Sequence, residues 1–231
     1  ALALNIGYNA AKITNKAVAV FSLEMSEQQL GIRLLGFDSG VNATKLRTGF
    51  LDKKELEKLV DSAGRLSELP VYIDDSSGIS VLEMKAKCRR LKKKNDLALV
   101  IIDYMQLIQG RRSAESRQLE MSEISRALKA LAKDLNVPVM ALSQLNRKVE
   151  DRTSKRPQIS DLRESGAIEQ DADVIVFIYR DEVYNPNSEE NRNLAEIIIG
   201  KQRNGPTGAF KLTFRKEQTA FGDYSSEEAP F

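Results

Sequence analysis

The stretch Ala98-Leu-Val-Ile-Ile-Asp103 is a short apolar run that ends in a carboxylate. Similar runs occur at residues 18–23, 71–73, 137–142 and 174–179. They are continuous rather than alternating in polarity, which is typical of strands buried on both faces. Helical patterns separate them along the chain. The sequence therefore predicts an α/β fold with a parallel sheet that helices cover on both faces.

The intervening segments carry clear helix signals. Residues 1–12 place Leu4, Tyr8 and Ala11 on one side, and a longer helix over Arg117–Leu135 turns Ile124, Leu128, Leu131 and Leu135 inward. Three further helices are expected to begin with capping boxes, because a Ser or Asp is followed three residues later by Gln or Glu. These pairs are Ser26 with Gln29, Asp52 with Glu55, and Ser80 with Glu83.

The last part of the chain has a different pattern. Two apolar, β-rich stretches at residues 194–201 and 209–214 flank Asn204-Gly205-Pro206, which predicts a β-hairpin. An acidic tail follows from about residue 222 and is expected to fray. With no linker or repeat in between, we interpret residues 1–231 as one domain.

Composition excludes several classes of function. The chain has no histidine, which excludes a Ser-His-Asp triad and His-rich metal sites, and a single cysteine, Cys88, which excludes an internal disulfide. The net charge is only +2, so a nucleic-acid partner must be argued from the distribution of charge. No apolar run is long enough to span a membrane and no signal peptide is evident, so we expect a cytoplasmic protein.

Three polar residues follow three of the predicted strands. Glu24 and Asp103 are carboxylates, and Gln144 is an amide. In an open parallel sheet, ligands bind at the carboxyl ends of the strands, and two carboxylates there suit a nucleotide with Mg²⁺. Each residue also has a simpler interpretation, as a helix cap or as a polar loop residue. Because the three residues converge at one sheet edge, the functional interpretation is favoured.

Two groups of basic residues are candidates for phosphate contacts. Lys201 and Arg203 lie two apart on a predicted strand, so they share a face and either grip a phosphate or protect a sheet edge. Basic residues without interleaved aromatics gather in two loops, which suits a sugar–phosphate backbone. These are Arg111, Arg112 and Arg117 in the first loop, and Arg147, Lys148, Arg152, Lys155 and Arg156 in the second.

The densest basic run, Lys85 to Lys94, has a different interpretation. It is helical and has an apolar stripe, so its lysines and arginines are expected to form a solvated outer face, with Cys88 in the core.

Together these motifs resemble the C-terminal, RecA-like motor domain of the DnaB-type replicative DNA helicases. The resemblance covers nearly the whole chain in order. The matching stretches are Phe21-Ser-Leu-Glu-Met25, Lys87-Cys-Arg-Arg-Leu-Lys92, Ile101-Ile-Asp-Tyr-Met-Gln-Leu-Ile108, Ser122-Glu-Ile-Ser-Arg-Ala-Leu-Lys-Ala-Leu-Ala132, Ala141-Leu-Ser-Gln-Leu145, Asp161-Leu-Arg-Glu-Ser-Gly166, Glu169-Gln-Asp-Ala-Asp173 and Lys201-Gln-Arg-Asn-Gly-Pro206.

This resemblance implies a RecA-like P-loop NTPase core with a C-terminal β-hairpin, and a role for each candidate residue. Glu24 is the base that activates the attacking water, Asp103 lies on the Mg²⁺ side and holds the ion through water, and Gln144 senses the γ-phosphate of ATP. The residues expected at the nucleotide are Ala1 and Arg33 from the same subunit, and Lys201, Gln202 and Arg203 from its neighbour in a homohexameric ring.

The resemblance also implies partners. Arg163, Glu164 and Gly166 match a channel loop that holds single-stranded DNA, and Arg117 is a further expected DNA contact. A helicase of this type unwinds duplex DNA at the replication fork with ATP and Mg²⁺, and works with a helicase loader and a primase.

The family's P-loop, Gly-x-x-x-x-Gly-Lys-Thr, would lie directly before Ala1, outside these 231 residues, as would the family's N-terminal domain. Without the amides and lysine of that loop, ATP hydrolysis by these residues alone is expected to be impaired. Two alternatives to a helicase motor therefore stay open. In the first, the chain is a catalytically incomplete module that docks a loader or primase. In the second, it is another RecA-type ATPase.

Overall fold

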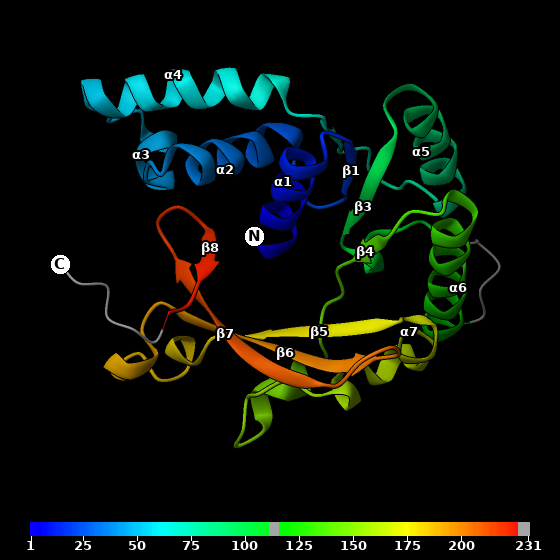
Figure 1. The fold of residues 1–231 in the computed structure, drawn as a ribbon. Coiled ribbons are helices and arrows are strands. Elements are labelled where there is room, and N and C mark those ends of the chain that lie inside the picture. The colour runs from blue at the N-terminus through cyan, green and yellow to red at the C-terminus, as the bar shows by residue number, and fades with distance from the viewer. Residues whose placement is uncertain (111–115, 226–231) are drawn as a thin grey trace.

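The computed structural model describes residues 1–110 and 116–225, apart from the side chains of residues 163–165. Its first half is built on four parallel strands in the order β2-β1-β3-β4 (Figure 1). The strands are β1 (Ala17–Ser22), β2 (Val71–Asp74), β3 (Leu97–Asp103) and β4 (Val139–Ala141). The predicted parallel sheet is confirmed, although β4 is shorter than the apolar run that indicated it.

Helices cover both faces of this sheet, as the continuous apolar strands require. On one face, α1 (Leu2–Thr14) and α2 (Glu27–Ser39) pack on Val18, Val20, Leu99 and Ile101. On the other face, α5 (Val81–Asn95) and α6 (Arg117–Leu135) pack on Ala19, Phe21, Val100 and Ile102. The inward residues predicted for α1 and α6 are all buried, and so is Cys88.

The three predicted capping boxes are all present. The side chains of Ser26, Asp52 and Ser80 each accept a hydrogen bond from the third residue of the following helix, whose Gln or Glu side chain accepts one in return. A cap of this kind stabilises a helix by about 1 kcal/mol. These boxes fix where α2, α4 (Lys53–Glu68) and α5 begin, and α3 (Ala43–Thr48) begins at a further cap, Asn42.

Helix α4 lies outside α2, one layer away from the sheet (Figure 1). Its apolar stripe is therefore only partly covered. Leu56 and Val60 remain 54% and 65% exposed, and Ser62 is the buried residue of this helix.

The second half is a separate, antiparallel sheet in the order β5-β6-β7-β8. Its strands are β5 (Val174–Tyr179), β6 (Leu194–Gln202), β7 (Gly208–Arg215) and β8 (Ala220–Asp223). The predicted hairpin is confirmed as β6 and β7. Strand β8 was not predicted, and its last two residues, Gly222 and Asp223, lie in the segment that we expected to fray.

The prediction for β5 was wrong in one respect. Its run Val-Ile-Val-Phe-Ile-Tyr indicated a strand buried on both faces of the parallel sheet, but it pairs antiparallel with β6. Ile175 and Phe177 enter a small core, whereas Val174, Val176 and Ile178 are between 45% and 51% exposed. The difference arises because every residue of the run is apolar, so composition hides an alternation in burial.

Short helical turns connect these strands. They are η1 (Met105–Leu107), η2 (Arg147–Asp151), η3 (Ile159–Ser165), α7 (Gly166–Asp171), η4 (Asp181–Val183) and η5 (Glu189–Asn191). Within the described ranges, no helix is long and apolar enough to cross a membrane.

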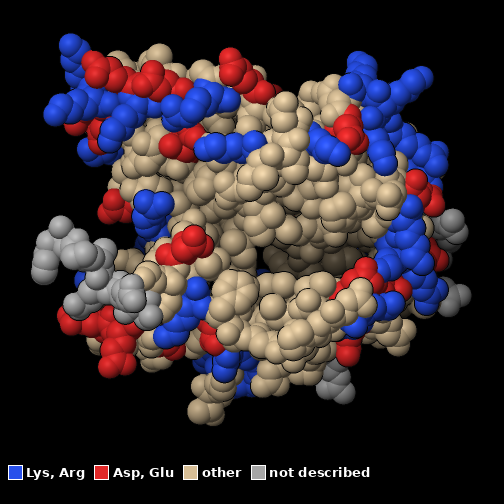
Figure 2. Space-filling view, viewed as in Figure 1, with Lys and Arg blue, Asp and Glu red and all other residues tan. Residues whose placement is uncertain are grey.

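Contacts at one end join the two halves. The buried Asn5 side chain of α1 accepts a hydrogen bond from the Phe221 amide of β8 at 2.9 Å, and the Ala43 amide donates to the Glu217 carbonyl at 2.8 Å. Figure 2 shows a hollow between the halves, lined mainly by uncharged residues, whereas Lys and Arg gather over α5, as predicted for its outer face.

Candidate functional site

The carboxyl ends of β1 and β3 lie side by side. Ser22 pairs with Asp103 in the sheet register, and the Leu23 amide donates to the Asp103 carbonyl at 2.7 Å. The buried Ser22 hydroxyl donates to the Met25 carbonyl at 2.6 Å, which closes the turn that carries Glu24 before α2 begins. The exposed Glu24 and the half-buried Asp103 therefore stand at the same sheet edge.

The carboxyl end of β4 brings Gln144 to this edge as well. The Leu142 amide donates to the Ile102 carbonyl, and the Met105 amide returns a bond to the Leu142 carbonyl, both at 2.9 Å. Gln144 follows two residues later. The expected convergence of Glu24, Asp103 and Gln144 is thus what the strand order produces.

Ala1, which was expected at the nucleotide together with Arg33, is half-buried directly before α1. Arg33 is half-buried on α2.

This donor set fits a nucleotide with Mg²⁺. Hard cations prefer carboxylate and water oxygens, and Mg²⁺ in such sites uses one or two carboxylates together with phosphate oxygens. Within the described ranges, no three metal-ligating side chains come together. An ion here would therefore rely on Asp103, water and the substrate, as a phosphate-bound Mg²⁺ does.

Lys201 and Arg203 occupy a different place. The Lys201 ammonium donates to the carbonyls of Glu169 and Ala172, and the Arg203 guanidinium donates to the Gln170 carbonyl at 2.8 Å. Both cations thus lie at the carboxyl end of α7, where the helix dipole favours positive charge. In the described part of the chain, no hydrogen bond or ion pair joins either cation to Glu24, Asp103 or Gln144.

Gln202, between the two cations, folds over the turn that follows. A Cβ atom added to Gly205 would meet the Gln202 Nε2 atom at 2.6 Å, so the end of this side chain lies close over the Asn204-Gly205 turn. The predicted pairing of Lys201 and Arg203 on one face is consistent with their shared contact with α7.

The candidate DNA-binding residues are described to different extents. Arg163 and Glu164 lie in η3, but their side chains are outside the described atoms, and Arg111 and Arg112 lie outside the described residues. Gly166 is exposed and begins α7. Arg117 begins α6, and its guanidinium donates to the Gln106 carbonyl and the Glu120 carboxylate.

Much of the second basic loop is paired within the chain. Arg152 bonds the Asp161 carboxylate at 2.9 Å, Arg156 contacts Glu196, and Lys155 donates to the Glu150 carbonyl. These three cations therefore support the loop, whereas Arg147 and Lys148 remain exposed.

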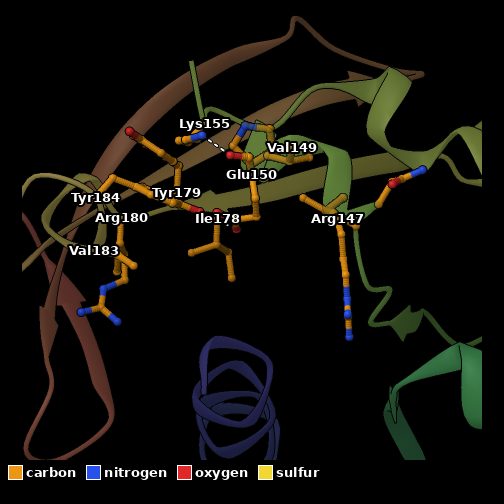
Figure 3. Close-up of a pocket in the computed structure, with 12 residues that line it drawn as sticks. Arg147, Val149, Glu150, Lys155, Ile178, Tyr179, Arg180, Val183 and Tyr184 are labelled. Atoms are coloured by element: carbon orange, nitrogen blue, oxygen red, sulfur yellow. Dashed lines mark hydrogen bonds between the residues drawn. The ribbon is translucent and has the colours of Figure 1, made fainter. Parts of the chain in front are cut away.

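Sequence reasoning missed a groove of about 320 Å³ between η2 and the end of β5 (Figure 3). The Tyr179 and Tyr184 rings stack there with centroids 5.8 Å apart. Burial and the Asp181 carboxylate raise the pKa of Tyr179 to about 12, so its hydroxyl stays a donor. Two tyrosines five residues apart, on either side of a charged turn, were the available signal.

Sequence reasoning also missed Gln106, which lies three residues after Asp103. Its side chain bonds Ser143 and Gln144 at the edge of the site. The signal was a lone amide directly after the strand that ends in Asp103, and its partners are remote in sequence.

Comparison with known proteins gives a consistent result. The family model of the DnaB-like helicase C-terminal domain matches residues 1–223. The chain is 57% identical over 222 residues to the replicative DNA helicase DnaB of Geobacillus stearothermophilus, and 54% identical to the replicative DNA helicase DnaC of Bacillus subtilis. Both matches cover 96% of this chain and 49% of the relative, so the chain spans about half the length of these relatives.

Solved structures agree. The ATPase domain of G40P superimposes with a TM-score of 0.91 at 41% identity, covering 96% of this chain and 79% of that one. A DnaB-like replicative helicase, described together with its interactions with primase, gives 0.92 at 40% identity and covers 96% and 54%.

Proposed function

Because the chain belongs to the family of DnaB-like helicase C-terminal domains, we propose that it is the ATP-hydrolysing motor of a replicative DNA helicase. Residues 1–231 form one ATPase domain that moves along single-stranded DNA and unwinds the duplex at the fork. The observation that carries the proposal is the convergence of Glu24, Asp103 and Gln144 at the carboxyl edge of the parallel sheet.

In ATP hydrolysis, each of these residues has a distinct role. The Glu24 carboxylate accepts the proton of the attacking water, whose oxygen forms the new bond to the γ-phosphorus as the bond to ADP breaks. Gln144 donates an amide hydrogen bond towards the γ-phosphate and so registers its presence. Ala1 and Arg33 line the nucleotide from the same subunit, and the Arg33 charge favours phosphate.

The residues also accommodate Mg²⁺, which supplies charge neutralisation to the phosphates when bound. Asp103 is the residue that would hold the ion, through water. Its place beside Ser22 keeps this carboxylate next to the turn that carries Glu24.

Lys201, Gln202 and Arg203 act on the ATP of the neighbouring subunit in a homohexamer. Two features support this assignment. The cations sit on carbonyls at the end of α7, where Arg203 also pairs with Asp173, and within the described residues no hydrogen bond or ion pair joins them to Glu24 or Asp103. An arginine supplied in trans is also a recurring device for stabilising the transition state of phosphoryl transfer.

Single-stranded DNA is held by Arg163, Glu164, Gly166 and Arg117, and primase and a helicase loader are the protein partners in the cytoplasm. The structure of a DnaB-like helicase described with primase supports the first of these protein partners. Backbone contacts of this kind carry little sequence preference and weaken with salt.

The test is ATP hydrolysis by the polypeptide as the cell makes it, with and without single-stranded DNA. Hydrolysis that rises on addition of DNA, together with unwinding of a forked duplex, is the expected result. A protein that binds primase or loader without any turnover would instead be a docking module. Turnover without unwinding would indicate another RecA-type ATPase.

A further inference from the structure

The Gln106 side chain clamps the loop that carries Gln144. Its Nε2 donates to the Ser143 hydroxyl at 2.8 Å and to the Gln144 carbonyl at 3.4 Å, and its Oε1 accepts from the Gln144 amide at 3.3 Å. Both ends of one amide are therefore used on two consecutive residues. This arrangement fixes the backbone on either side of the Gln144 α-carbon.

Gln106 itself is anchored to the strand that ends in Asp103. It lies in η1, whose first residue, Met105, is buried and donates to the Leu142 carbonyl. The clamp thus ties the segment after β3 to the segment after β4. Any shift of η1 changes the position of Gln144 relative to Asp103.

Arg117 holds the same turn from the other side. Its guanidinium donates to the Gln106 backbone carbonyl and to the Glu120 carboxylate, and the side chain is still 51% exposed. A guanidinium has five N–H donors, so it can keep these bonds and still face a phosphate. Arg117 therefore contacts solvent and Gln106 at once.

We propose that Gln106 is a positioning residue for Gln144, and that Arg117 connects it to bound single-stranded DNA. The inference rests on the proposed function. It gives a physical route by which a DNA phosphate at Arg117 alters the place of Gln144, through one carbonyl and one side-chain amide. Neither Gln106 nor Arg117 touches the reacting atoms in this route.

The experiment compares Gln106→Met with Gln118→Met in the whole protein. Methionine keeps the length of glutamine but removes its donors and acceptor, and Gln118 is exposed on α6 one residue after Arg117. The rate and KM for ATP are measured with and without a saturating oligothymidylate. For Gln106→Met we expect the DNA-stimulated rate to fall about tenfold with KM within about twofold, because two or three hydrogen bonds are lost. Gln118→Met should match the unaltered protein.

A second arm separates positioning from a general loss of structure. Arg117→Gln should also lower DNA stimulation at saturating DNA, and the double variant should lose no more than the more affected single variant, since both act through one route. Losses that multiply would overturn the proposal. Ser143→Ala removes only one partner of the clamp, so it decides the matter if Gln106→Met does not fold, and about a threefold loss is expected.

The outcomes distinguish this inference from the proposed function. An unaltered protein without DNA-stimulated hydrolysis refutes the proposed function. A stimulated protein whose Gln106→Met and Ser143→Ala variants are stimulated equally refutes only the role of Gln106.

Discussion

Strand β5 of the antiparallel sheet is as apolar as β1 and β3 of the parallel sheet, yet the two sheets place their functional groups differently. In the parallel sheet, β1 is buried along its whole length and β3 along most of it, and the polar groups Glu24 and Asp103 stand where these strands end. The antiparallel sheet leaves one face of β5 half-exposed and carries Lys201 and Arg203 beside α7. The first holds acidic groups at a rigid edge, and the second holds basic groups on an outer hairpin.

The separation of the carboxylates from the cations bears on how copies of this chain would assemble. Carboxylates and cations that together suit phosphoryl transfer occur in one chain, but no hydrogen bond or ion pair among the residues that the structure describes joins Lys201 or Arg203 to Glu24 or Asp103. A head-to-tail ring brings the second group of one copy to the first group of the next. On this view a single subunit carries two half-sites, and its two cations are held by the carbonyls at the end of α7 and by Asp173.

The largest expected effect comes from Arg203→Ala. Removing an arginine that acts in trans should lower the rate of ATP hydrolysis about a thousandfold, while the parallel edge of the same chain stays intact. Steady-state hydrolysis with single-stranded DNA measures this loss. Gln118→Met serves as the control, and an unchanged rate would place the cation outside the site.

Glu24→Gln should lower the rate by at least about a hundredfold, because the amide cannot accept the proton of the attacking water. Ring formation, followed by size-exclusion chromatography, should be unaffected since Glu24 is an exposed turn residue.

Mixing Glu24→Gln with Arg203→Ala tests whether the two sheets contribute to one site from different subunits. About one interface in four of a random mixture then pairs an intact Glu24 with an intact Arg203, so hydrolysis should return although each variant alone is inactive. A mixture that stays inactive would show that both residues act within one subunit.

Much of the parallel half could be predicted from the sequence. Parallel strands bring their carboxyl ends to one edge, so the proximity of Glu24, Asp103 and Gln144 followed from order alone. The capping boxes likewise fixed three helix starts. Local patterns sufficed here because each signal lies within a few residues of the feature that it predicts.

The antiparallel half and the clamp were less predictable for a physical reason. The apolar run of β5 does not reveal that one of its faces is half-exposed, and β8 is short and contains Gly222. Gln106 bonds Ser143, which is 37 residues away, and Arg203 bonds Gln170, which is 33 residues away. Such partners depend on tertiary structure that no local pattern encodes.

A matched pair of isoleucines tests the difference in burial. Ile102 in β3 is fully buried, and Ile178 in β5 is 45% exposed. Ile102→Ala should lower the free energy of unfolding by about 2–5 kcal/mol, because it leaves a cavity in a packed core, whereas Ile178→Ala should cost about 1 kcal/mol. Urea unfolding of the 231-residue chain measures both. Equal losses would mean that the two strands are covered to the same extent.

The smallest effect concerns Asp38, which holds α1, α2 and α4 together around the parallel sheet. The Tyr8 hydroxyl and the Arg65 guanidinium both donate to its carboxylate. Burial alone would raise the pKa of Asp38, but these hydrogen bonds outweigh it and hold the pKa below its usual 3.8. A carboxylate whose pKa is lowered in the folded state stabilises the fold above its unfolded pKa, and that contribution is lost as the pH falls through the folded value.

Asp38→Asn should therefore cost about 1 kcal/mol of unfolding free energy at pH 7, and the difference from the unaltered chain should shrink below about pH 4. Urea unfolding at pH 7, 5 and 3 measures it. Asp181→Asn in the antiparallel half is the variant for comparison. Hydrogen bonds from Tyr179 and then Asn185 lower the pKa of Asp181 as well, but this carboxylate is less buried than that of Asp38. A difference for Asp38 that stays constant down to pH 3 would mean that its charge does not stabilise the helices, and that packing alone holds them on the sheet.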